Sequence, residues 1–221
     1  MKKLILTSVV AFVAISSNAG AQSAEAIIDR AAAAYAQLNS MRAEFRQTLT
    51  NPLTGSTQTT SGVILRKKPN LLSITFDSGD RVVADGSTLW AYLPSSVPDQ
   101  VMRMPYNNSA AGSVDPADQF LKSPRTRFSV TSSGTATIAG RPAHIVTLVP
   151  KRANNQFRSA RIWIDDTDSS IRQFDVESPN GLRRRVVVTR FTANPSVPTS
   201  SFRFAPPKGV KVVDQQTLGD F

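Results

Sequence analysis

Residues 66–92 read RKKPNLLSITFDSGDRVVADGSTLWAY, and this stretch decides the fold of the chain. Leu72, Ile74 and Phe76 alternate with polar residues, which is the period of a strand with one apolar face. Asp85-Gly86 lies between two apolar runs and favours a tight hairpin turn, because glycine adopts positive φ without strain. The stretch therefore predicts strands of an antiparallel sheet, and we expect the rest of the chain to extend this sheet or to cover its apolar face.

The first 21 residues have the pattern of a secretory signal peptide. Lys2 and Lys3 precede an apolar run over residues 4–15, which is too short to span a bilayer. Residues 19–21 then supply the small side chains of an A-x-A cleavage site. We expect export, cleavage after Ala21 and a single mature domain over residues 22–221; a buried first helix is the alternative.

The composition restricts both the compartment and the chemistry of the protein. The chain has 221 residues, a formal net charge of +10, one histidine and no cysteine. Without cysteine there is no disulfide, no lipid anchor of the bacterial lipoprotein type and no thiol catalysis, so we expect a soluble periplasmic protein. Its basic charge suits anionic lipid head groups, acidic glycans or an acidic protein partner, whereas we expect no nucleic acid as a partner in that compartment.

Helix and strand patterns continue on both sides of the central stretch. Ser23 is the expected cap of an amphipathic helix over residues 24–38, and Asp115-Pro116 is the expected start of a short helix over residues 117–122 that covers an open end of the sheet. Turn signals every 8–12 residues or so indicate a barrel or sandwich of meandering strands. Further strands are predicted over residues 41–50, 57–66, 101–104, 128–131, 135–139, 144–149, 159–164, 171–176 and 184–191, with a late short strand at Phe202 and Phe204.

Catalytic and metal-binding patterns are weak. His144 lies in an alternating strand, no G-x-S-x-G motif is present, and we interpret it as a structural histidine. One imidazole without a thiolate does not predict a zinc site. The run DDTD at residues 165–168 lacks the glycine and the distal glutamate of a calcium loop and indicates a turn. Residues 183–185 are three arginines, which favour a solvated strand edge, with a binding role as the alternative.

An inward-facing apolar surface is predicted from the aromatic and unbranched side chains of these strands. A closed or nearly closed barrel of this length can hold more than its own side chains. Methionine and flat aromatic rings suit a pocket for irregular acyl chains, and an ordinary dry core is the alternative. The predicted cavity residues are Phe45, Leu72, Ile74, Phe76, Trp90, Tyr92, Met102 and Met104.

Three motifs occur in order and at compatible spacing: KKPNLLSITF at residues 67–76, VVADGSTLWAY at 82–92 and FRFAPPKGVKVVDQQ at 202–216. Together they resemble the LolA family of periplasmic outer-membrane lipoprotein carriers, and RIWIDDTDSSIRQFDV at 161–176 is similar to a late hairpin of that family. The resemblance implies a mainly β, α+β fold, namely a half-open antiparallel β-barrel with a helical lid over a hydrophobic cavity.

The function that the resemblance implies is transport without covalent chemistry. A carrier of this family takes lipoproteins from an inner-membrane ABC-type release complex, shields their acyl chains across the periplasm and passes them to an outer-membrane acceptor. We therefore expect a monomer that binds acyl chains, with no catalytic residue, no metal and no cofactor. The lid residues that we expect to close over the cavity are Ile27, Tyr35, Phe120 and Leu121.

One position departs from the family pattern. The arginine that precedes the proline in the family, and ties the lid to the barrel by hydrogen bonds, is matched here by Lys68. A lysine ammonium can donate to lid carbonyls but constrains direction less than a guanidinium. Arg66 would face the same way on a strand, so it is the alternative to Lys68 as the lid latch. A lipid-binding sensor on the same scaffold and a hydrolase that uses His144 are the alternative functions.

Overall fold

A computed structural model describes residues 22–106, 114–152 and 157–215, and the predicted signal peptide lies outside them. The described strands form one open sheet of 12 strands, in the order β12-β6-β5-β4-β3-β2-β1-β11-β10-β9-β8-β7. The elements are α1 (Ala24–Ala36), β1 (Ser40–Thr50), β2 (Thr57–Lys67), β3 (Leu71–Phe76), β4 (Arg81–Asp85), β5 (Thr88–Tyr92), β6 (Gln100–Pro105), α3 (Pro116–Leu121), α4 (Pro124–Arg127), β7 (Phe128–Ile138), β8 (Arg141–Pro150), β9 (Ser159–Asp165), β10 (Ile171–Glu177), β11 (Arg183–Ala193), the 3₁₀ helix η1 (Thr199–Phe202) and β12 (Lys211–Asp214).

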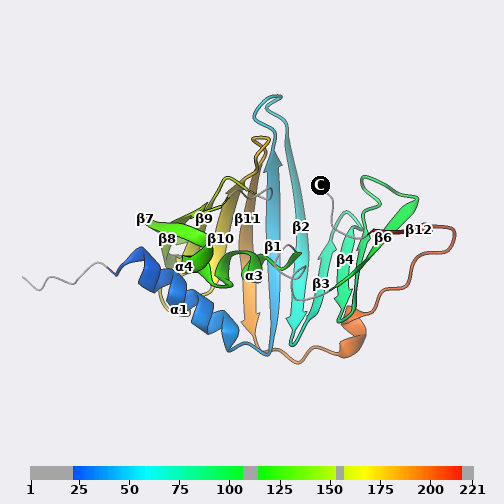
Figure 1. The fold of residues 1–221 in the computed structure, drawn as a ribbon, viewed down its shortest axis with the longest axis horizontal. Helices are drawn as coiled ribbons and strands as arrows, with labels where there is room; N and C mark the ends of the chain where they lie inside the picture. Colours follow the sequence, from blue (N-terminus) through cyan, green and yellow to red (C-terminus); the bar gives the residue numbers. More distant parts are fainter. Residues whose placement is uncertain (1–21, 107–113, 153–156, 216–221) are drawn as a thin grey trace, which may run out of the picture.

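The fold class predicted from the sequence is confirmed: the protein is mainly β, with helices over an open sheet. The pairs between described strands are antiparallel except β12 with β6, which is parallel. Figure 1 shows α1 lying across one end of the sheet and α3 in front of its middle strands. None of the described helices combines the length and the hydrophobicity needed to cross a membrane.

Both predicted helix starts are confirmed. The Ser23 hydroxyl accepts a hydrogen bond from the Ala26 amide at 3.1 Å, which satisfies one of the free amides at the start of α1. The Asp115 carboxylate accepts from the Ala117 amide at 2.9 Å and Pro116 occupies the first turn of α3. The buried face of α1 lies against β7, β8 and β9, and the helix also contacts α3 and α4.

The predicted hairpin at Asp85-Gly86 joins β4 to β5. Gly86 has a φ of +108°, which a side chain would strain. The Asp85 carboxylate accepts hydrogen bonds from the Ser87 and Thr88 amides at 3.0 and 2.9 Å, so the turn is closed by its own first residue. This turn sets the register of β4 with β5, in which Ala84 lies opposite Leu89.

Two local predictions are wrong. Residues 128–131 and 135–139 are not separate strands, because β7 continues through Ser133-Gly134 as a bulge in which Gly134 has a φ of +96°. Phe202 and Phe204 do not form a strand: Phe202 ends η1, and the last strand is β12, further along the chain. The prolines on both sides, Pro198 and Pro206-Pro207, cannot donate ladder hydrogen bonds, which disfavours a strand between them.

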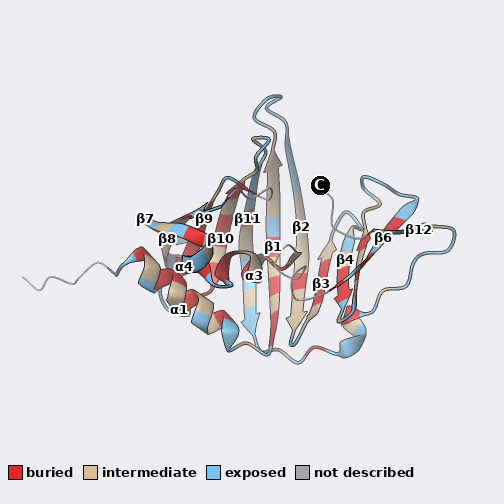
Figure 2. Cartoon of the chain, viewed as in Figure 1, coloured by how far each residue is buried: buried red, intermediate tan, exposed pale blue. Residues whose placement is uncertain are grey.

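The core lies at one end of the long central strands. Figure 2 shows buried residues on α1 and α3, on the lower parts of β1 and β2, and on β3 and β4. The first half of β1 is buried, whereas the hairpin tip between β1 and β2 is exposed, with Leu53 88% exposed. The helices and the sheet therefore enclose apolar side chains on one face, which we call the helix side, and the other is the outer face.

Candidate functional site

A continuous apolar surface crosses β2 to β6 on the helix side. Leu72 lies opposite Ala84, Ala84 opposite Leu89, and Leu89 opposite Met104. Because directly opposed residues of an antiparallel pair share a face, these side chains form one row across four strands. Six of the eight predicted cavity residues are in or against this apolar cluster: Phe45, Leu72, Ile74 and Met104 are buried, and Phe76 and Met102 are half-buried.

A hollow of about 470 Å³ lies between β1, β2 and β3, and we call it the β1–β3 hollow. Phe45 and Phe76 line it as an edge-to-face pair, with ring centroids 5.5 Å apart and an interplanar angle of 88°. Gly62 lies opposite both rings, and a Cβ there would come within 2.7 Å of the Phe45 Cζ. The aromatic pair thus requires a glycine beneath it. Glu44 and Arg46, which flank Phe45 on β1 and therefore lie on the other face, and Asp77 also line the hollow, so its lining comes from both faces of these strands.

The predicted inward placement of Trp90 and Tyr92 is wrong. Along β5 these residues alternate with Leu89, which is fully buried on the helix side, so both rings face outward. There they pack against Phe204, with centroid distances of 5.7 and 6.2 Å. The aromatic residues of this strand therefore hold the C-terminal segment against the outer face.

The four predicted lid residues are buried in the same apolar cluster as the helix-side row. Ile27 and Tyr35 project from α1, and Phe120 and Leu121 from α3. The Phe120 ring is 5.2 Å from the Phe174 ring of β10 and 5.8 Å from that of Phe157. Phe157 was not identified from the sequence, and its buried ring completes this contact. In this structure the helices are closed against the sheet.

Two cations of the β2 end tie the helices to the sheet. Lys68 Nζ donates to the Ala36 carbonyl at the end of α1, at 2.6 Å. Arg66 Nε lies 2.7 Å from Asp115 Oδ2, and Arg66 Nη2 lies 3.2 Å from Asp118 Oδ1. Arg66 and Lys68 therefore contact different helices, whereas the sequence pattern offered them as alternatives for one latch.

The Arg66–Asp115 pair is shielded from water. Asp115 is 3% exposed, and burial raises the pKa of its carboxyl to about 6, although Arg66 opposes that shift. Burial, together with the charges of Asp115 and Asp118, also raises the pKa of the nearby Tyr106 hydroxyl to about 12. Asp115 both caps α3 and pairs with Arg66. The position of this short helix therefore depends on the Arg66 guanidinium.

The other polar candidates have structural partners. His144 Nε2 lies 3.0 Å from Asp166 Oδ1, and His144 does not line the β1–β3 hollow. Asp165 is bonded by Arg141 and Arg172, which hold the pKa of its carboxyl well below the usual range, against burial. Within residues 22–106, 114–152 and 157–215, no group of three or more His, Asp or Glu side chains is placed to hold a metal ion.

The predicted strand edge at residues 183–185 is wrong, because β11 lies between β1 and β10 in the sheet. The three arginines also do not share one environment. Arg185 makes two hydrogen bonds to Asp175 on the outer face, at 2.9 and 2.8 Å. Arg184 lies opposite Leu49 and Val176, on the helix side of β11, and is exposed. The run therefore splits between the two faces of the sheet, as its alternation predicts.

Comparisons with known proteins agree with this architecture. The family described as "Outer membrane lipoprotein carrier protein LolA" matches residues 36–205 of the chain. An outer-membrane lipoprotein carrier protein from Edwardsiella ictaluri is 31% identical over 182 residues, which cover 81% of this chain and 83% of that protein. One from Serratia proteamaculans is 27% identical over 218 residues, which cover 98% of this chain and all of that protein.

One solved structure is similar in fold at low sequence identity. The crystal structure of an uncharacterized conserved protein from Thermus thermophilus has a TM-score of 0.56 and 14% identity, and the match covers 87% of this chain and 99% of that chain. At that level of identity the similarity shows the shared fold alone.

Proposed function

The chain belongs to the LolA family of outer membrane lipoprotein carrier proteins, and from this premise we propose that it carries lipoproteins by enclosing their acyl chains between its sheet and its helices. The observation that carries the proposal is the apolar row on the helix side, which belongs to one buried cluster with residues of α1 and α3. Phe45 and Phe76, which lie in or against this cluster, also line the β1–β3 hollow. The alternative hydrolase would use His144, which lies 3.0 Å from Asp166 and does not line the β1–β3 hollow.

The need for such an enclosure follows from hydration. Each methylene moved out of water contributes roughly 0.8 kcal/mol, so a lipoprotein with several acyl chains does not leave a membrane unshielded. The carrier must hold these chains and then release them. A lid supports both steps, because its own apolar residues and the cargo compete for the same face of the sheet.

The few polar contacts that attach the helices to the sheet support such competition between lid and cargo. Phe120 and Leu121 of α3 cover the helix side, but α3 is only six residues long. Its tie to β2 is the ion pair between Arg66 and the Asp115 and Asp118 carboxylates. We propose that this pair and the Lys68–Ala36 hydrogen bond are the latches that open on loading.

The remaining steps are part of the same proposal. The chain would be exported to the periplasm, receive lipoproteins from an inner-membrane ABC-type release complex and pass them as a monomer to an outer-membrane acceptor. The family membership supports this order of events.

The test uses the protein without residues 1–21. It is incubated with membranes that bear a lipoprotein, and the soluble fraction is examined by size-exclusion chromatography with mass determination. We expect a soluble one-to-one complex with the lipoprotein, and none with membranes whose lipoprotein lacks its acyl chains. A lipoprotein that stays with the membrane, or that is captured equally well without acyl chains, contradicts the proposal.

A further inference from the structure

The two edges of the sheet differ in how they are protected. One edge is β12, which has four residues, is charged at Lys211 and Asp214, and carries the Arg103–Asp214 ion pair. The other edge is β7, which has 11 residues, reads FSVTSSGTATI without a charge or a proline, and among the described strands pairs only with β8. A free strand edge presents unpaired amides and carbonyls to any extended chain. The β7 edge is therefore open to pairing.

The hydrogen bonds of β7 show which residues face outward. The Lys151 amide donates to the Arg127 carbonyl at 2.9 Å, so residue 127 and, by alternation, Ser129 and Thr131 point their backbone groups toward β8. The backbone amides and carbonyls that point to the free edge are then those of Phe128, Val130 and Ser132. Pro150 lies opposite Phe128, as expected of a residue with no amide to donate. The bulge after Ser132 ends this regular stretch.

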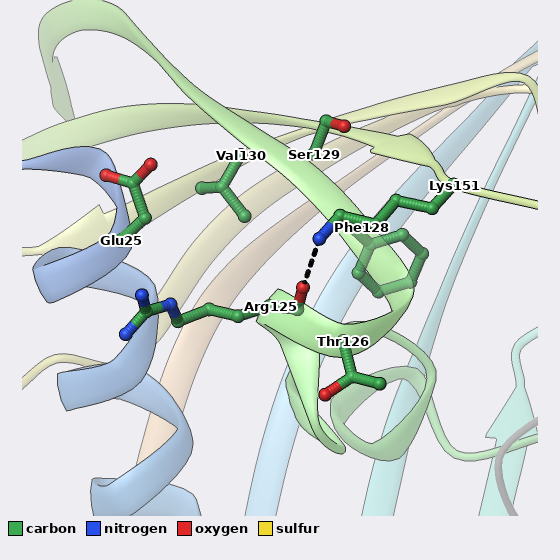
Figure 3. Close-up of a pocket in the computed structure, with 7 residues that line it drawn as sticks. All are labelled: Glu25, Arg125, Thr126, Phe128, Ser129, Val130 and Lys151. Carbon is green, nitrogen blue, oxygen red and sulfur yellow. Dashed lines mark hydrogen bonds between the residues drawn. The ribbon is translucent and has the colours of Figure 1, made fainter.

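A hollow of about 650 Å³ adjoins these same residues, and we call it the β7 hollow. Figure 3 shows Val130 of β7 projecting between Glu25 of α1 and Arg125 of α4. Phe128 lines the hollow and is also buried in the apolar cluster, where its ring lies 5.8 Å from Phe157. Phe128 therefore belongs both to the buried apolar cluster and to the start of the free edge.

The charge around the β7 hollow favours an acidic occupant. Arg125 and Lys151 line it and are exposed, and Arg152 is exposed beside them. Arg125 lies 3.3 Å from Asp29, and Lys151 donates to the Arg125 carbonyl, an interaction that leaves the ammonium charge unneutralised. Among the described residues that line the hollow, Glu25 is the one with a carboxylate.

We propose that the free edge of β7 pairs with the extended polypeptide segment that follows the lipidated residue of the cargo, and that Arg125 and Lys151 favour acidic residues in it. The inference rests on the proposed function. A segment leaving the enclosure at Phe128 meets the backbone groups of Val130 and Ser132, and an added strand satisfies them as a neighbouring strand would. The carrier then holds both the lipid and the first residues of its cargo.

The test compares synthetic lipopeptides that share one triacylated cysteine. One ends at the cysteine amide, one carries an acidic tail of about ten residues, and one carries the same tail with alternate backbone amides methylated. Affinity is measured by displacement of a fluorescent fatty acid. We expect the acidic tail to bind about tenfold more tightly than the tail-less lipid, because a few backbone hydrogen bonds are partly offset by the ordering of the tail. The methylated tail should show no gain.

Two substitutions of Val130 distinguish the contribution of its backbone amide from that of its side chain. Val130→Pro removes the outward amide without removing a bond to β8, and we expect it to lose the tenfold gain while binding the tail-less lipid as before. Val130→Ala keeps the amide and should keep the gain. The methylated tail provides the same test on the unaltered protein, should Val130→Pro not fold.

The outcomes distinguish the inference from the function it rests on. A tail-less lipid that does not bind overturns both. A tail-less lipid that binds, with a tail that adds nothing or adds equally when methylated, overturns the inference alone. A change of oligomeric state in the unliganded protein on Val130→Pro also overturns it, because the edge would then pair with a second copy of the chain.

Discussion

The helix-covered end of the sheet and the β1–β3 hollow use aromatic side chains in opposite ways. Over β7–β10 the Phe120 ring contacts those of Phe157 and Phe174, and all three are buried. In the hollow, Phe45 and Phe76 form a single pair beside about 470 Å³ of space, and Phe76 is only half-buried. In this closed form the helix-covered end is filled by the protein itself, whereas the hollow is open space beside the aromatic pair. Stability and binding should therefore respond to different residues.

The largest expected effect is on stability at the filled end. Phe120→Ala removes a fully buried ring that contacts two others, and we expect the free energy of unfolding to fall by about 3–5 kcal/mol. Phe76→Ala, in the hollow, should lower it by less than half as much. Urea denaturation with constant m-value measures both. Equal losses at the two positions would contradict the distinction between a filled end and an open one.

The latch between the two regions should give the next largest effect. Arg66→Leu leaves the Asp115 carboxyl buried without its partner, and breaking a buried pair in this way costs about 3 kcal/mol. We expect this cost to appear as opening of α3, measured by faster hydrogen exchange of the amides of residues 117–121.

Two further variants control that result. Asp115→Asn added to Arg66→Leu removes the uncompensated charge and should recover much of the protection of α3. Lys68→Leu removes one exposed hydrogen bond to α1 and should cost about 1 kcal/mol or less, without affecting α3. Equal effects of Arg66→Leu and Lys68→Leu on residues 117–121 would argue against separate latches.

A smaller loss of stability is expected when Gly62, beneath the Phe45–Phe76 pair, is replaced by alanine. In Gly62→Ala the new Cβ would meet the Phe45 ring at 2.7 Å and collide with the Thr75 carbonyl oxygen, so the strands must shift. Such overpacking costs about 1–3 kcal/mol. Ser61→Ala is the matched control on the same strand, and thermal unfolding of both variants measures the difference. An unchanged melting temperature for Gly62→Ala would show that the pair does not depend on the glycine.

The smallest and most gradual effect is that of pH on the lid. The pKa of Asp115 is raised to about 6 when α3 is closed and returns toward its ordinary value of about 4 when the helix lifts into water. A proton on Asp115 thus favours the closed form: this contribution is complete below about pH 4 and is lost as pH rises through 6. We expect α3 to exchange faster at pH 7.5 than at pH 5, after correction for intrinsic rates. Asp115→Asn should remove that difference.

The sequence predicted local features well where a short pattern determines them. Ser23 and Asp115 are caps because their side chains reach amides two or three residues away. The alternation of Leu72, Ile74 and Phe76 places these three residues on one face, and the structure places that face on the helix side. These are local properties, and the chain within a few residues determines them.

Features that depend on distant partners were not predictable in the same way. Trp90 and Tyr92 alternate as regularly as Leu72 and Ile74, but alternation does not say which face is inner. The register of β4 with β5 places Leu89 on the helix side, and Phe204, more than a hundred residues along the chain, covers the two aromatic rings. Arg66 likewise finds Asp115 far along the chain, so the sequence offered it only as an alternative latch.

The most direct measurement compares one substitution on each face of the sheet. Phe76→Glu puts a charge into the β1–β3 hollow, whereas Tyr92→Glu puts the same charge on the outer face, opposite Arg81. Binding of a triacylated cysteine amide is measured for both, with circular dichroism to show that both are folded. We expect Phe76→Glu to lose at least tenfold in affinity and Tyr92→Glu to bind as the unaltered protein does. Equal binding by the two variants, or a loss confined to Tyr92→Glu, would contradict the placement of acyl chains on the helix side.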